Sequence, residues 1–419
     1  MQNKMTNLPQ GWEVKKLEEI ANIKGGKRLP KGKNLLDNNT KFAYIRVADF
    51  QDNGTINLQN IKFINENTYN VLKNYKIYDD NLYISIAGTI GKSGIIPKEL
   101  NGAILTENAV KLEYIQNNIS NKFMYFFTLS NIFKTQIQTS TKIVAQPKLA
   151  ITRLKQIQIP LPPLKEQERI VGILDESFAK IDESIKILEQ DLLNLDELMQ
   201  SALQKAFNPL KDNAKENYKL PQGWEWKSLG EIANTSSGGT PSRNKKEYWE
   251  NGNIKWLKSG ELNDGYIDFI EENITEEAIK NSSAKIFQKG TLLIAMYGAT
   301  AGKLGILNLD STTNQAICAF LHKDKNIKFL EKFLFYFLFF LRDKIIKDSF
   351  GGAQPNINQT YIKNLQIPLP PIKEQEQITS HLDELSSHVK NLKQNYQAQI
   401  KDLQELKNSL LDKAFKGNL

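Results

Sequence analysis

The sequence has little cysteine and histidine, and it has no uninterrupted hydrophobic run of membrane-spanning length. One cysteine, Cys318, and three histidines occur among 419 residues. A single cysteine excludes an intramolecular disulfide framework and a multi-cysteine metal site, and it favours a reducing compartment, the cytoplasm. The histidines have no metal-ligand spacing. The most apolar stretch, Phe329–Leu341, contains two charged residues and is shorter than the roughly 20 residues that cross a bilayer. We predict a buried helix there and no membrane role.

The usual signatures of a catalytic centre are also absent. The sequence contains no Asn-Pro-Pro-aromatic or Asp-Pro-Pro-Tyr methylation motif, no glycine fingerprint for S-adenosylmethionine and no acidic metal cluster placed before a lysine. Two Gly-rich segments, 88–93 and 298–303, invite a phosphate-loop interpretation. The nucleotide-loop pattern requires a glycine five positions before the Gly-Lys pair, where Ile86 and Tyr297 stand. We therefore predict no catalytic residue, no metal site and no cofactor on this chain.

What the sequence does have is a tandem duplication. Three motifs occur twice in the same order: Leu-Pro-Gln-Gly-Trp-Glu at 8–13 and 220–225, Gln-Ile-Pro-Leu-Pro-Pro-x-Lys-Glu-Gln-Glu at 158–168 and 366–376, and Lys-Ala-Phe at 205–207 and 413–415. Between the motifs the halves diverge, and segments 24–50 and 236–260 share little beyond a Gly-Gly pair. A repeated scaffold with different inserts indicates one task performed twice on two targets.

The start of each half has the pattern of a mixed α/β domain. Short runs rich in β-branched and aromatic residues alternate with turn residues, which predicts strands. An apolar segment of helical length follows in each half. The predicted strands are Phe42–Val47, Tyr83–Ala87, Ile254–Leu257 and Thr291–Met296, and the predicted helices are Phe123–Phe133 and Phe329–Leu341.

Each half then continues into a long helix. A Pro-Leu-Pro-Pro segment, at 160–163 and at 368–371, ends the preceding structure and opens the helix. Apolar residues follow at heptad spacing, which is typical of a coiled coil. The predicted seam is Val171, Leu174, Phe178, Ile181, Ile185, Leu188, Leu192, Leu195, Met199 and Ala202 in the first helix, and Ile378, Leu382, Leu385, Val389, Leu392, Tyr396, Gln399, Leu403, Leu406 and Leu410 in the second.

Because the halves are equivalent, we predict that the helices pair as an antiparallel coiled coil about a pseudo-twofold axis. Two amphipathic helices that each dock on their own domain are the alternative. The predicted organisation is a globular domain at 1–163, a long helix at 164–208, a linker at 209–219, a second globular domain at 220–371 and a second long helix at 372–419.

The positive charge of the chain lies outside the long helices. The net charge is +8; residues 164–207 carry 5 basic and 10 acidic side chains and residues 373–419 carry 7 of each, so the rest of the chain carries +13. Positive charge on the divergent domains favours contact with nucleic-acid phosphates.

Candidate DNA-contacting residues lie in the Gly-rich segments and in the turns that follow the β-rich runs. Loops that carry cations and hydroxyls suit phosphate and base-edge contacts, and amides beside the Gln-Pro turns suit adenine edges. The candidates are Lys24, Lys27, Arg28, Arg46, Lys92, Gln146, Lys148, Ser237, Thr240, Arg243, Lys258, Tyr297, Lys303, Gln354 and Asn356.

Structural roles for these residues stay open from the sequence. The Gly-rich segments can be surface loops, Arg46 and Lys258 can form salt bridges, the Gly-Lys lysines can be solvated, and the amides can cap turns. Trp12 and Trp224 belong to the repeated frame, so we predict that they anchor a core and do not stack on bases.

The whole chain resembles the specificity subunits of type I restriction-modification systems. The resemblance rests on Leu-Pro-x-Gly-Trp at the start of each half, on Gly-Lys at 91–92 and 302–303, and on Ile-Pro-Leu-Pro-Pro-x-x-Glu-Gln at 159–167 and 367–375 before a long heptad helix. It implies that each globular domain is a target recognition domain that reads one half of a bipartite, asymmetric site in double-stranded DNA. It also implies that the helices set the spacer between the half-sites.

The same resemblance implies partner subunits that carry the chemistry. Two modification (methyltransferase) subunits would dock on the helices with S-adenosylmethionine and methylate adenine N6. Restriction subunits would add ATP- and Mg²⁺-dependent translocation and cleavage. The alternatives are an enzyme, a coiled-coil scaffold without a DNA role, and a specificity subunit that serves another class of restriction system.

Overall fold

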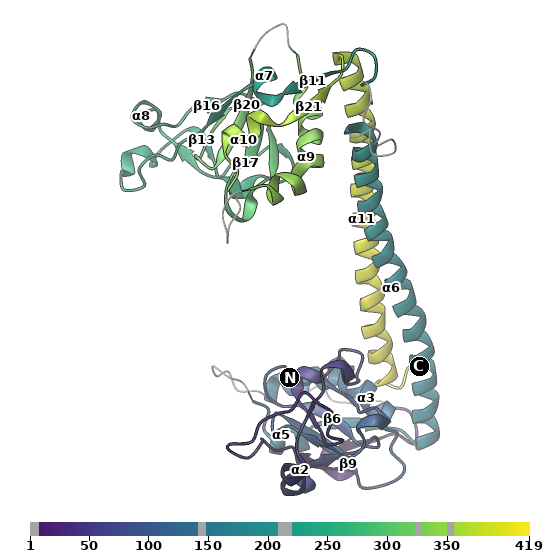
Figure 1. Cartoon of the computed structure of the whole chain (residues 1–419). Coiled ribbons are helices and arrows are strands. Elements are labelled where there is room, and N and C mark those ends of the chain that lie inside the picture. Colours follow the sequence, from purple (N-terminus) through teal and green to yellow (C-terminus); the bar gives the residue numbers. More distant parts are fainter. Residues whose placement is uncertain (1–7, 141–147, 208–219, 324–327, 350–355) are drawn as a thin grey trace. The chain divides into compact units, whose positions relative to one another are not determined.

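The computed structural model describes residues 8–140, 148–207, 220–323, 328–349 and 356–419 (Figure 1). The chain divides into two compact units, one made of residues 1–189 with 397–419 and the other of residues 190–396. Each unit holds one globular module and part of both long helices. We call residues 8–163 the first module and residues 220–371 the second module. Among the helices of the described ranges, none has the length and apolar character needed to cross a membrane.

The first module contains two four-stranded sheets with short helices around them. One sheet has the strand order β2 (Ala21–Gly25), β9 (Ala109–Tyr114), β6 (Leu82–Ser85), β7 (Ser93–Ile95), and the other has β4 (Lys62–Phe63), β3 (Ala43–Ile45), β8 (Ala103–Leu105), β5 (Lys76–Ile77). The helices are α1 (Leu17–Ile20), α2 (Glu66–Leu72), α3 (Asn121–Leu129), α4 (Asn131–Ser140) and α5 (Ile151–Lys155). All four residues of the central strand β6 are buried, as expected for a strand that is covered on both faces.

The second module repeats this arrangement with one additional strand. Its sheets have the orders β12 (Ala233–Ser237), β20 (Ile317–His322), β17 (Leu292–Ala295), β18 (Leu304–Leu307), β14 (Gly265–Ile267) and β15 (Asn273–Ile274), β13 (Ile254–Leu257), β19 (Ser311–Thr313), β16 (Ile286–Phe287). The helices are α7 (Leu229–Ile232), α8 (Glu276–Lys280), α9 (Glu331–Lys347) and α10 (Gln359–Asn364). The mixed α/β class and the internal repeat are therefore confirmed.

The four predicted strands contain or overlap β3, β6, β13 and β17, so these predictions are confirmed. The apolar segment 123–133 is not a single helix. Ser130 separates α3 from α4 because its backbone is extended, with ψ 154°. Its buried hydroxyl accepts a hydrogen bond from the Phe133 N–H (3.3 Å) and so caps the second helix. In the second half the apolar segment forms α9, which is continuous over 17 residues.

The two repeated motifs of each half pair with one another as a short antiparallel ribbon. The ribbons are β1 (Glu13–Lys16) with β10 (Gln158–Leu161) and β11 (Glu225–Ser228) with β21 (Gln366–Leu369). Gly11 and Gly223 both have φ +87°, a left-handed conformation that glycine adopts without strain. Trp12 is half-buried against the core of the first module, which confirms it as a core anchor. The indole N–H of Trp224 instead donates to Glu374 (2.6 Å).

A buried glutamine joins each long helix to its module. The long helices are α6 (Leu164–Phe207) and α11 (Ile372–Ala414). In the first turn of α6, Gln167 accepts from the Ser120 N–H (2.9 Å) and donates to the carbonyls of Asn118 and Pro162. In α11, Gln375 accepts from the Leu330 N–H (2.9 Å) and donates to the carbonyls of Lys328 and Pro370. Both side chains are buried, so each amide satisfies three backbone groups that would otherwise lack partners.

Each module is completed by the end of the helix that begins in the other half of the sequence. Phe415, after the last turn of α11, packs on Phe123 and Phe127 of α3, with ring centroids 5.1 and 5.5 Å apart. Phe207, at the end of α6, packs on Phe333 and Phe337 of α9 at 5.2 and 5.6 Å. The repeated Lys-Ala-Phe motif therefore supplies a core residue to each unit.

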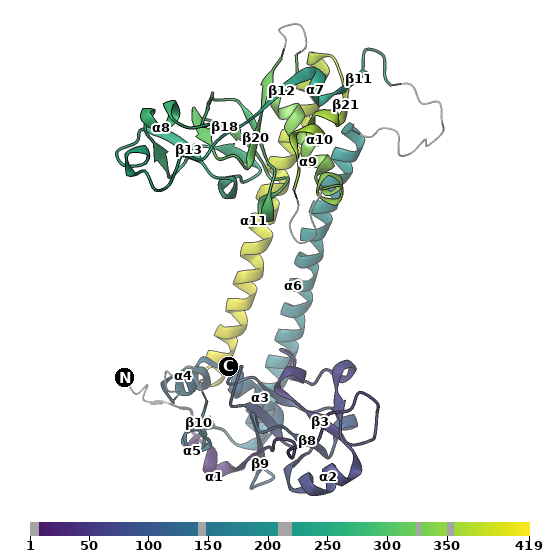
Figure 2. The ribbon, with the colours of Figure 1, turned by 60° about the vertical axis from the view of Figure 1, so that its left-hand side comes forward.

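Within the units, α6 and α11 lie side by side (Figure 2) and run antiparallel. Lys407 forms an ion pair with Asp182, and Lys393 forms one with Asp196. Fourteen residues, two heptads, separate the two lysines on α11 and the two aspartates on α6. An increase in residue number along one helix thus corresponds to a decrease along the other. This pairing confirms the predicted antiparallel helix pair.

The predicted seam is correct for α6 and partly wrong for α11. Leu392 and Leu406 were assigned to the seam, yet they are 39% and 46% exposed. Positions 393, 400 and 407, one residue further along, are half-buried instead. The inward positions on α11 therefore alternate as 389, 393, 396, 400, 403 and 407. Two of them are lysines, which bury their alkyl stems and keep the ammonium groups on the acidic side chains of α6.

We predict that Phe415→Ala and Phe207→Ala each lower the free energy of unfolding by about 3–5 kcal/mol, the usual cost of truncating a buried phenylalanine. Denaturant unfolding of the full chain measures the change. Phe269→Ala is the matched control, because Phe269 is 76% exposed; its effect should be below about 0.5 kcal/mol. Equal effects at buried and exposed positions would show that the helix ends do not complete the modules.

We also predict that Gln375→Leu lowers the free energy of unfolding by at least about 2 kcal/mol. The substitution leaves one N–H and two carbonyl groups buried without a partner, and each such group costs about 1–3 kcal/mol. Thermal unfolding of the full chain measures it. Gln377→Leu, on an exposed position of the same helix, should change little. A stable Gln375→Leu protein would contradict the role of the buried amide.

Candidate nucleic-acid interface

One short turn organises the candidate interface of each module. In the first module this central turn is residues 106–108, between β8 and β9, and in the second it is residues 314–316, between β19 and β20. The Thr106 N–H donates to the Ile45 carbonyl at the end of β3 (3.0 Å). Asn314 donates in the same way to Leu257 at the end of β13 (2.9 Å). The two turns are therefore equivalent positions of the repeat.

The Gly-Gly segment lies directly against the central turn in the first module and against the last residue of β19, next to the turn, in the second. A Cβ on Gly26 would lie 2.1 Å from the Thr106 carbonyl oxygen, and one on Gly238 would lie 2.0 Å from the Thr313 carbonyl oxygen. Only glycine allows the two backbones to approach so closely. A buried aromatic donor then fixes the segment in each module. The Tyr44 hydroxyl donates to the Lys27 carbonyl (2.8 Å), and the Trp256 ring nitrogen donates to the Gly239 carbonyl (3.0 Å).

The Gly-Lys turn, residues 86–93 in the first module and 296–303 in the second, also attaches to the central turn. The Ile86 N–H donates to the Asn108 carbonyl (2.8 Å), and the Met296 N–H donates to the Ala316 carbonyl (2.7 Å). The following residues form isolated β-bridges, Ala87 with Lys148 and Tyr297 with Asn356. In each module, three segments that are far apart in the sequence thus meet around one turn. They are the Gly-Gly segment, the Gly-Lys turn and the segment at 148 or 356. We call this surface the reader face.

In the first module the candidate cations differ in how strongly they are engaged. Arg46 is held by Asp49 (2.6 Å) and by the Asn60 carbonyl (3.0 Å), so the salt bridge kept as its alternative is present. Lys92 pairs with Asp52 (2.8 Å) and Lys24 with Glu113 (2.5 Å). Arg28 pairs with Glu107 (2.6 Å), and Lys27 and Lys148 are exposed. Gln146 lies outside the described residues.

In the second module, Arg243 and Lys258 share one carboxylate. Both bind Glu272 at 2.7 Å, and the Arg243 guanidinium lies 3.6 Å from the ring centroid of Trp249. Partial burial raises the pKa of Glu272, but the hydrogen bonds from the two cations lower it more, so the net pKa falls.

The other candidates of the second module lie around the central turn. The hydroxyls of Ser237 and Thr240 hydrogen-bond to glutamine side chains, Gln359 and Gln315. Lys303 and Asn356 are exposed, and Tyr297 is 40% exposed. Gln354 lies outside the described residues. None of these placements tests DNA contact, so the candidates remain predictions.

Sequence reasoning missed the side chains of the central turns, Glu107 and Gln315, and it also missed Glu272 and Trp249. The available signal was a short polar segment between two buried strands in each half. Glu107 is a partner of Arg28; burial raises its pKa, and the hydrogen bonds from Arg28 and Thr106 outweigh burial and leave the pKa below the usual range. Acidic side chains on a cationic face orient the cations, which composition alone does not reveal.

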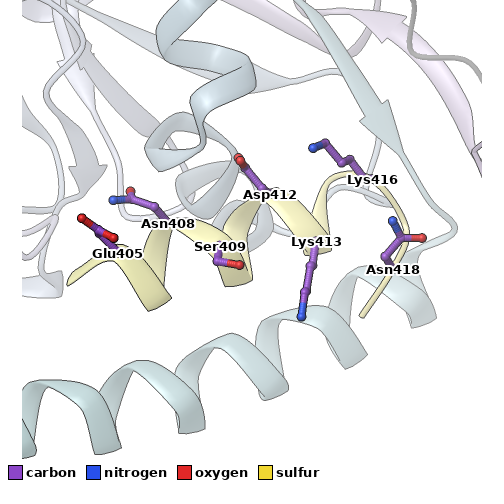
Figure 3. Close-up of a pocket in the computed structure, with 7 residues that line it drawn as sticks. All are labelled: Glu405, Asn408, Ser409, Asp412, Lys413, Lys416 and Asn418. Carbon is purple, nitrogen blue, oxygen red and sulfur yellow. The ribbon is translucent and has the colours of Figure 1, made fainter. Parts of the chain in front are cut away.

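Two hollows lie in the first unit. A cavity of about 390 Å³ opens between the Gly-Lys turn and α4, and its lining includes Asp52, Lys92 and Lys134. A polar hollow of about 460 Å³ lies along the end of α11 (Figure 3). Beside it, Asp412 accepts a hydrogen bond from Asn131 of α4 (3.2 Å). In the described ranges no group of three or more His, Cys, Asp or Glu side chains is arranged to hold a metal ion.

Comparison with known families decides what this repeated architecture is. The model of the family described as "Type I restriction modification DNA specificity domain" matches residues 9–192 and again residues 221–402. The chain belongs to this family. The resemblance inferred from the sequence motifs is thereby confirmed, and the two matches coincide with the two halves of the repeat.

Several relatives are type I specificity subunits. The EcoR124I/EcoR124II subunit of Escherichia coli is 28% identical over 242 residues, which cover 57% of each chain. The MjaIX subunit of Methanocaldococcus jannaschii is 33% identical over 200 residues, 46% of this chain and 45% of the relative. The chain thus spans about half the length of these two relatives. The EcoBI subunit of Escherichia coli is 24% identical across 100% of this chain and 88% of the relative.

Two solved structures share the fold of this type I specificity chain. A chain from work on complex assembly and conformational transition of the type I R-M system has a TM-score of 0.79 at 22% identity, covering 99% of this chain and 100% of that one. The HsdS subunit from Thermoanaerobacter tengcongensis has a TM-score of 0.62 at 22% identity, with both chains fully covered. At this identity the likeness establishes the fold alone.

We predict that Gly238→Ala destabilises the second module by about 1–3 kcal/mol, the cost of inserting a methyl group into closely packed atoms. The new Cβ would meet the Thr313 backbone, which cannot move without disrupting β19. Gly260→Ala is the control, because a Cβ there meets nothing within 4 Å. Unfolding of both proteins in denaturant measures the difference; similar midpoints for the two variants would contradict the close approach.

Proposed function

We propose that this chain is the DNA-sequence-reading subunit of a type I restriction-modification complex, and that each module reads one half of a bipartite, asymmetric site. One observation carries the proposal: equivalent backbone hydrogen bonds hold the central turn, the Gly-Gly segment and the Gly-Lys turn in both modules, and the side chains on the two faces differ. A repeated frame with different side chains suits two different base sequences. The excess positive charge outside the helices suits binding to phosphates.

The chain itself acts without catalysis in this proposal. The single thiol, Cys318, is buried and burial raises its pKa to about 12, so it is not a nucleophile near neutral pH. Methyl transfer to adenine N6 and DNA cleavage then belong to methyltransferase and restriction subunits, which bring S-adenosylmethionine, ATP and Mg²⁺. Large apolar side chains exposed on the long helices, among them Ile187, Leu193 and Leu198, suit a protein partner that covers them.

The paired helices would fix the gap between the two half-sites. Helix α6 has 44 residues, which corresponds to about 66 Å at 1.5 Å per residue. Half-sites read from one side of DNA lie about one turn, roughly 34 Å, or a multiple apart. A continuous helix pair holds such a separation with less freedom than an irregular linker.

The test is modified-base sequencing in a methylation-free host that expresses the chain with its cognate methyltransferase subunit. We expect adenine methylation at a split motif. Replacing residues 24–150 by the corresponding segment of a relative should change one half of the motif and leave the other half unchanged. Methylation at unsplit sites, or at sites that the replacement does not alter, would place sequence reading in another subunit.

We further predict that Lys303→Ala weakens DNA binding by the assembled complex equally for all base sequences. Lys303 is exposed on the Gly-Lys turn, where its ammonium would contact a phosphate and not a base. The dependence of log affinity on log salt should become less steep by about one. Lys390→Ala, on an exposed position of the long helix α11 and outside the modules, should leave the slope unchanged. An unchanged slope for Lys303→Ala would remove it from the phosphate contacts.

A further inference from the structure

The two reader faces carry different side-chain pairs at one equivalent position. The Lys27 N–H donates to the Leu105 carbonyl (2.9 Å), and the Gly239 N–H donates to the Thr313 carbonyl (2.9 Å). These bonds align the residue after each donor, Arg28 with Thr240. The bonds of the central turns described above align Glu107 with Gln315. The position is therefore occupied by Arg28 with Glu107 in the first module and by Thr240 with Gln315 in the second.

In the first module the pair holds an arginine by one nitrogen. Arg28 donates from Nε to Glu107 Oε1 (2.6 Å), and the second carboxylate oxygen accepts from the Thr106 hydroxyl (2.9 Å). The Arg28 side chain is 78% exposed. Its two terminal nitrogens donate to no residue in the ranges that the structure describes. A guanidinium fixed through Nε thus presents its two remaining nitrogens as a fork toward solvent.

In the second module the pair holds an amide by its oxygen. The Thr240 hydroxyl donates to Gln315 Oε1, and both residues are exposed. This bond uses one of the two lone pairs of the oxygen. Within the part of the chain that the structure describes, the Gln315 amide nitrogen and the second lone pair of Oε1 remain for a ligand. The arrangement is the reverse of that in the first module. Here the longer side chain, Gln315, lies on the central turn, and the residue that holds it, Thr240, follows the Gly-Gly segment.

Three other candidate cations, Arg46, Arg243 and Lys258, are each held by an acidic side chain. Arg46 binds Asp49 through two nitrogens and also the Asn60 carbonyl. Arg243 and Lys258 both bind Glu272. These groups neutralise one another and support the loops. The Arg28 and Gln315 pairs instead leave a two-point donor or donor–acceptor edge toward solvent.

We propose that this paired position reads one base pair in each half-site, with Arg28 reading the guanine of a G·C pair and Gln315 reading the adenine of an A·T pair. The inference rests on the proposed function. The arginine fork matches guanine O6 and N7, and a glutamine amide matches adenine N7 and N6 in the major groove. Glu107 and Thr240 are positioning residues, which orient the reading group through Nε and Oε1.

The test exchanges the pairs between the modules. Arg28→Thr with Glu107→Gln in the full chain, expressed with the cognate methyltransferase subunit, should convert one G·C pair of the first half-site to A·T. Thr240→Arg with Gln315→Glu should convert one A·T pair of the second half-site to G·C. Modified-base sequencing reads both outcomes. The unaltered half-site and the gap should stay the same in each variant.

A binding measurement keeps the inference testable if an exchanged pair does not support methylation. The assembled Arg28→Ala complex is titrated with the wild-type duplex and with duplexes changed at one base pair. It should lose about 10- to 100-fold discrimination at a single G·C pair, the usual contribution of one bidentate contact, and keep it elsewhere. Lys122→Thr with Asp175→Asn is the control, because it removes a different exposed ion pair (2.6 Å) of the same unit.

The outcomes separate the inference from the function on which it rests. Uniform weakening of Arg28→Ala on all duplexes would make Arg28 a phosphate contact and overturn the inference. Unchanged motifs in both exchanged variants would also overturn it, while a split motif for the wild type would leave the proposed function standing. No split motif for the wild-type complex would instead overturn the proposed function.

Discussion

The structure depends on a buried amide that ties each long helix to its module. Gln167 and Gln375 each satisfy three backbone groups at the point where a proline-rich strand becomes a helix. Without that amide the backbone groups would be buried and unpaired, and the helix would have no fixed direction from the module. The constraint occurs once in each half because the sequence motif occurs twice. It explains why Pro-Pro-x-x-Glu-Gln is repeated while the surrounding loops differ.

A second constraint is that the hydrophobic core of each unit is completed by a residue from the other half of the sequence. Phe415 completes the core that begins with the first module, and Phe207 completes that of the second. Neither core is built from one half of the sequence alone. The reader faces lie on the modules around turns that are held by backbone hydrogen bonds. Their side chains can therefore differ between the two modules without a change in the frame.

Much of this architecture could be predicted because it is encoded by local patterns. The repeat, the strands of high β-propensity and the heptad helices were all visible in the sequence. In α11, Leu392 and Leu406 were predicted to lie in the seam, but the next residues, Lys393 and Lys407, lie inward instead. The prediction was wrong because it preferred leucine to lysine at inward positions. Ser130 ends a helix through capping and backbone geometry, which an apolar pattern does not record.

The side-chain pairs on the reader faces could not be predicted from the sequence, and the reason is different. Alignment of the similar stretches Thr106-Glu107-Asn108-Ala109 and Thr313-Asn314-Gln315-Ala316 places Glu107 opposite Asn314. The hydrogen bonds place it opposite Gln315, one residue further on. Arg28 and Glu107 are also 79 residues apart, so no local spacing links them. The sequence identified the cations, and only the fold identified the groups that orient them.

The most direct test of the account is a matched deletion in the two helices. Removing residues 186–192 and 397–403 takes one heptad from each helix between the two interhelical ion pairs, so the register of the pair is kept. Modified-base sequencing of the assembled complex should then show both half-site sequences unchanged and the gap between them shorter by about 10 Å, or about three base pairs. An unchanged gap, or a change in the bases of either half-site, would contradict two independent readers joined by a helical spacer.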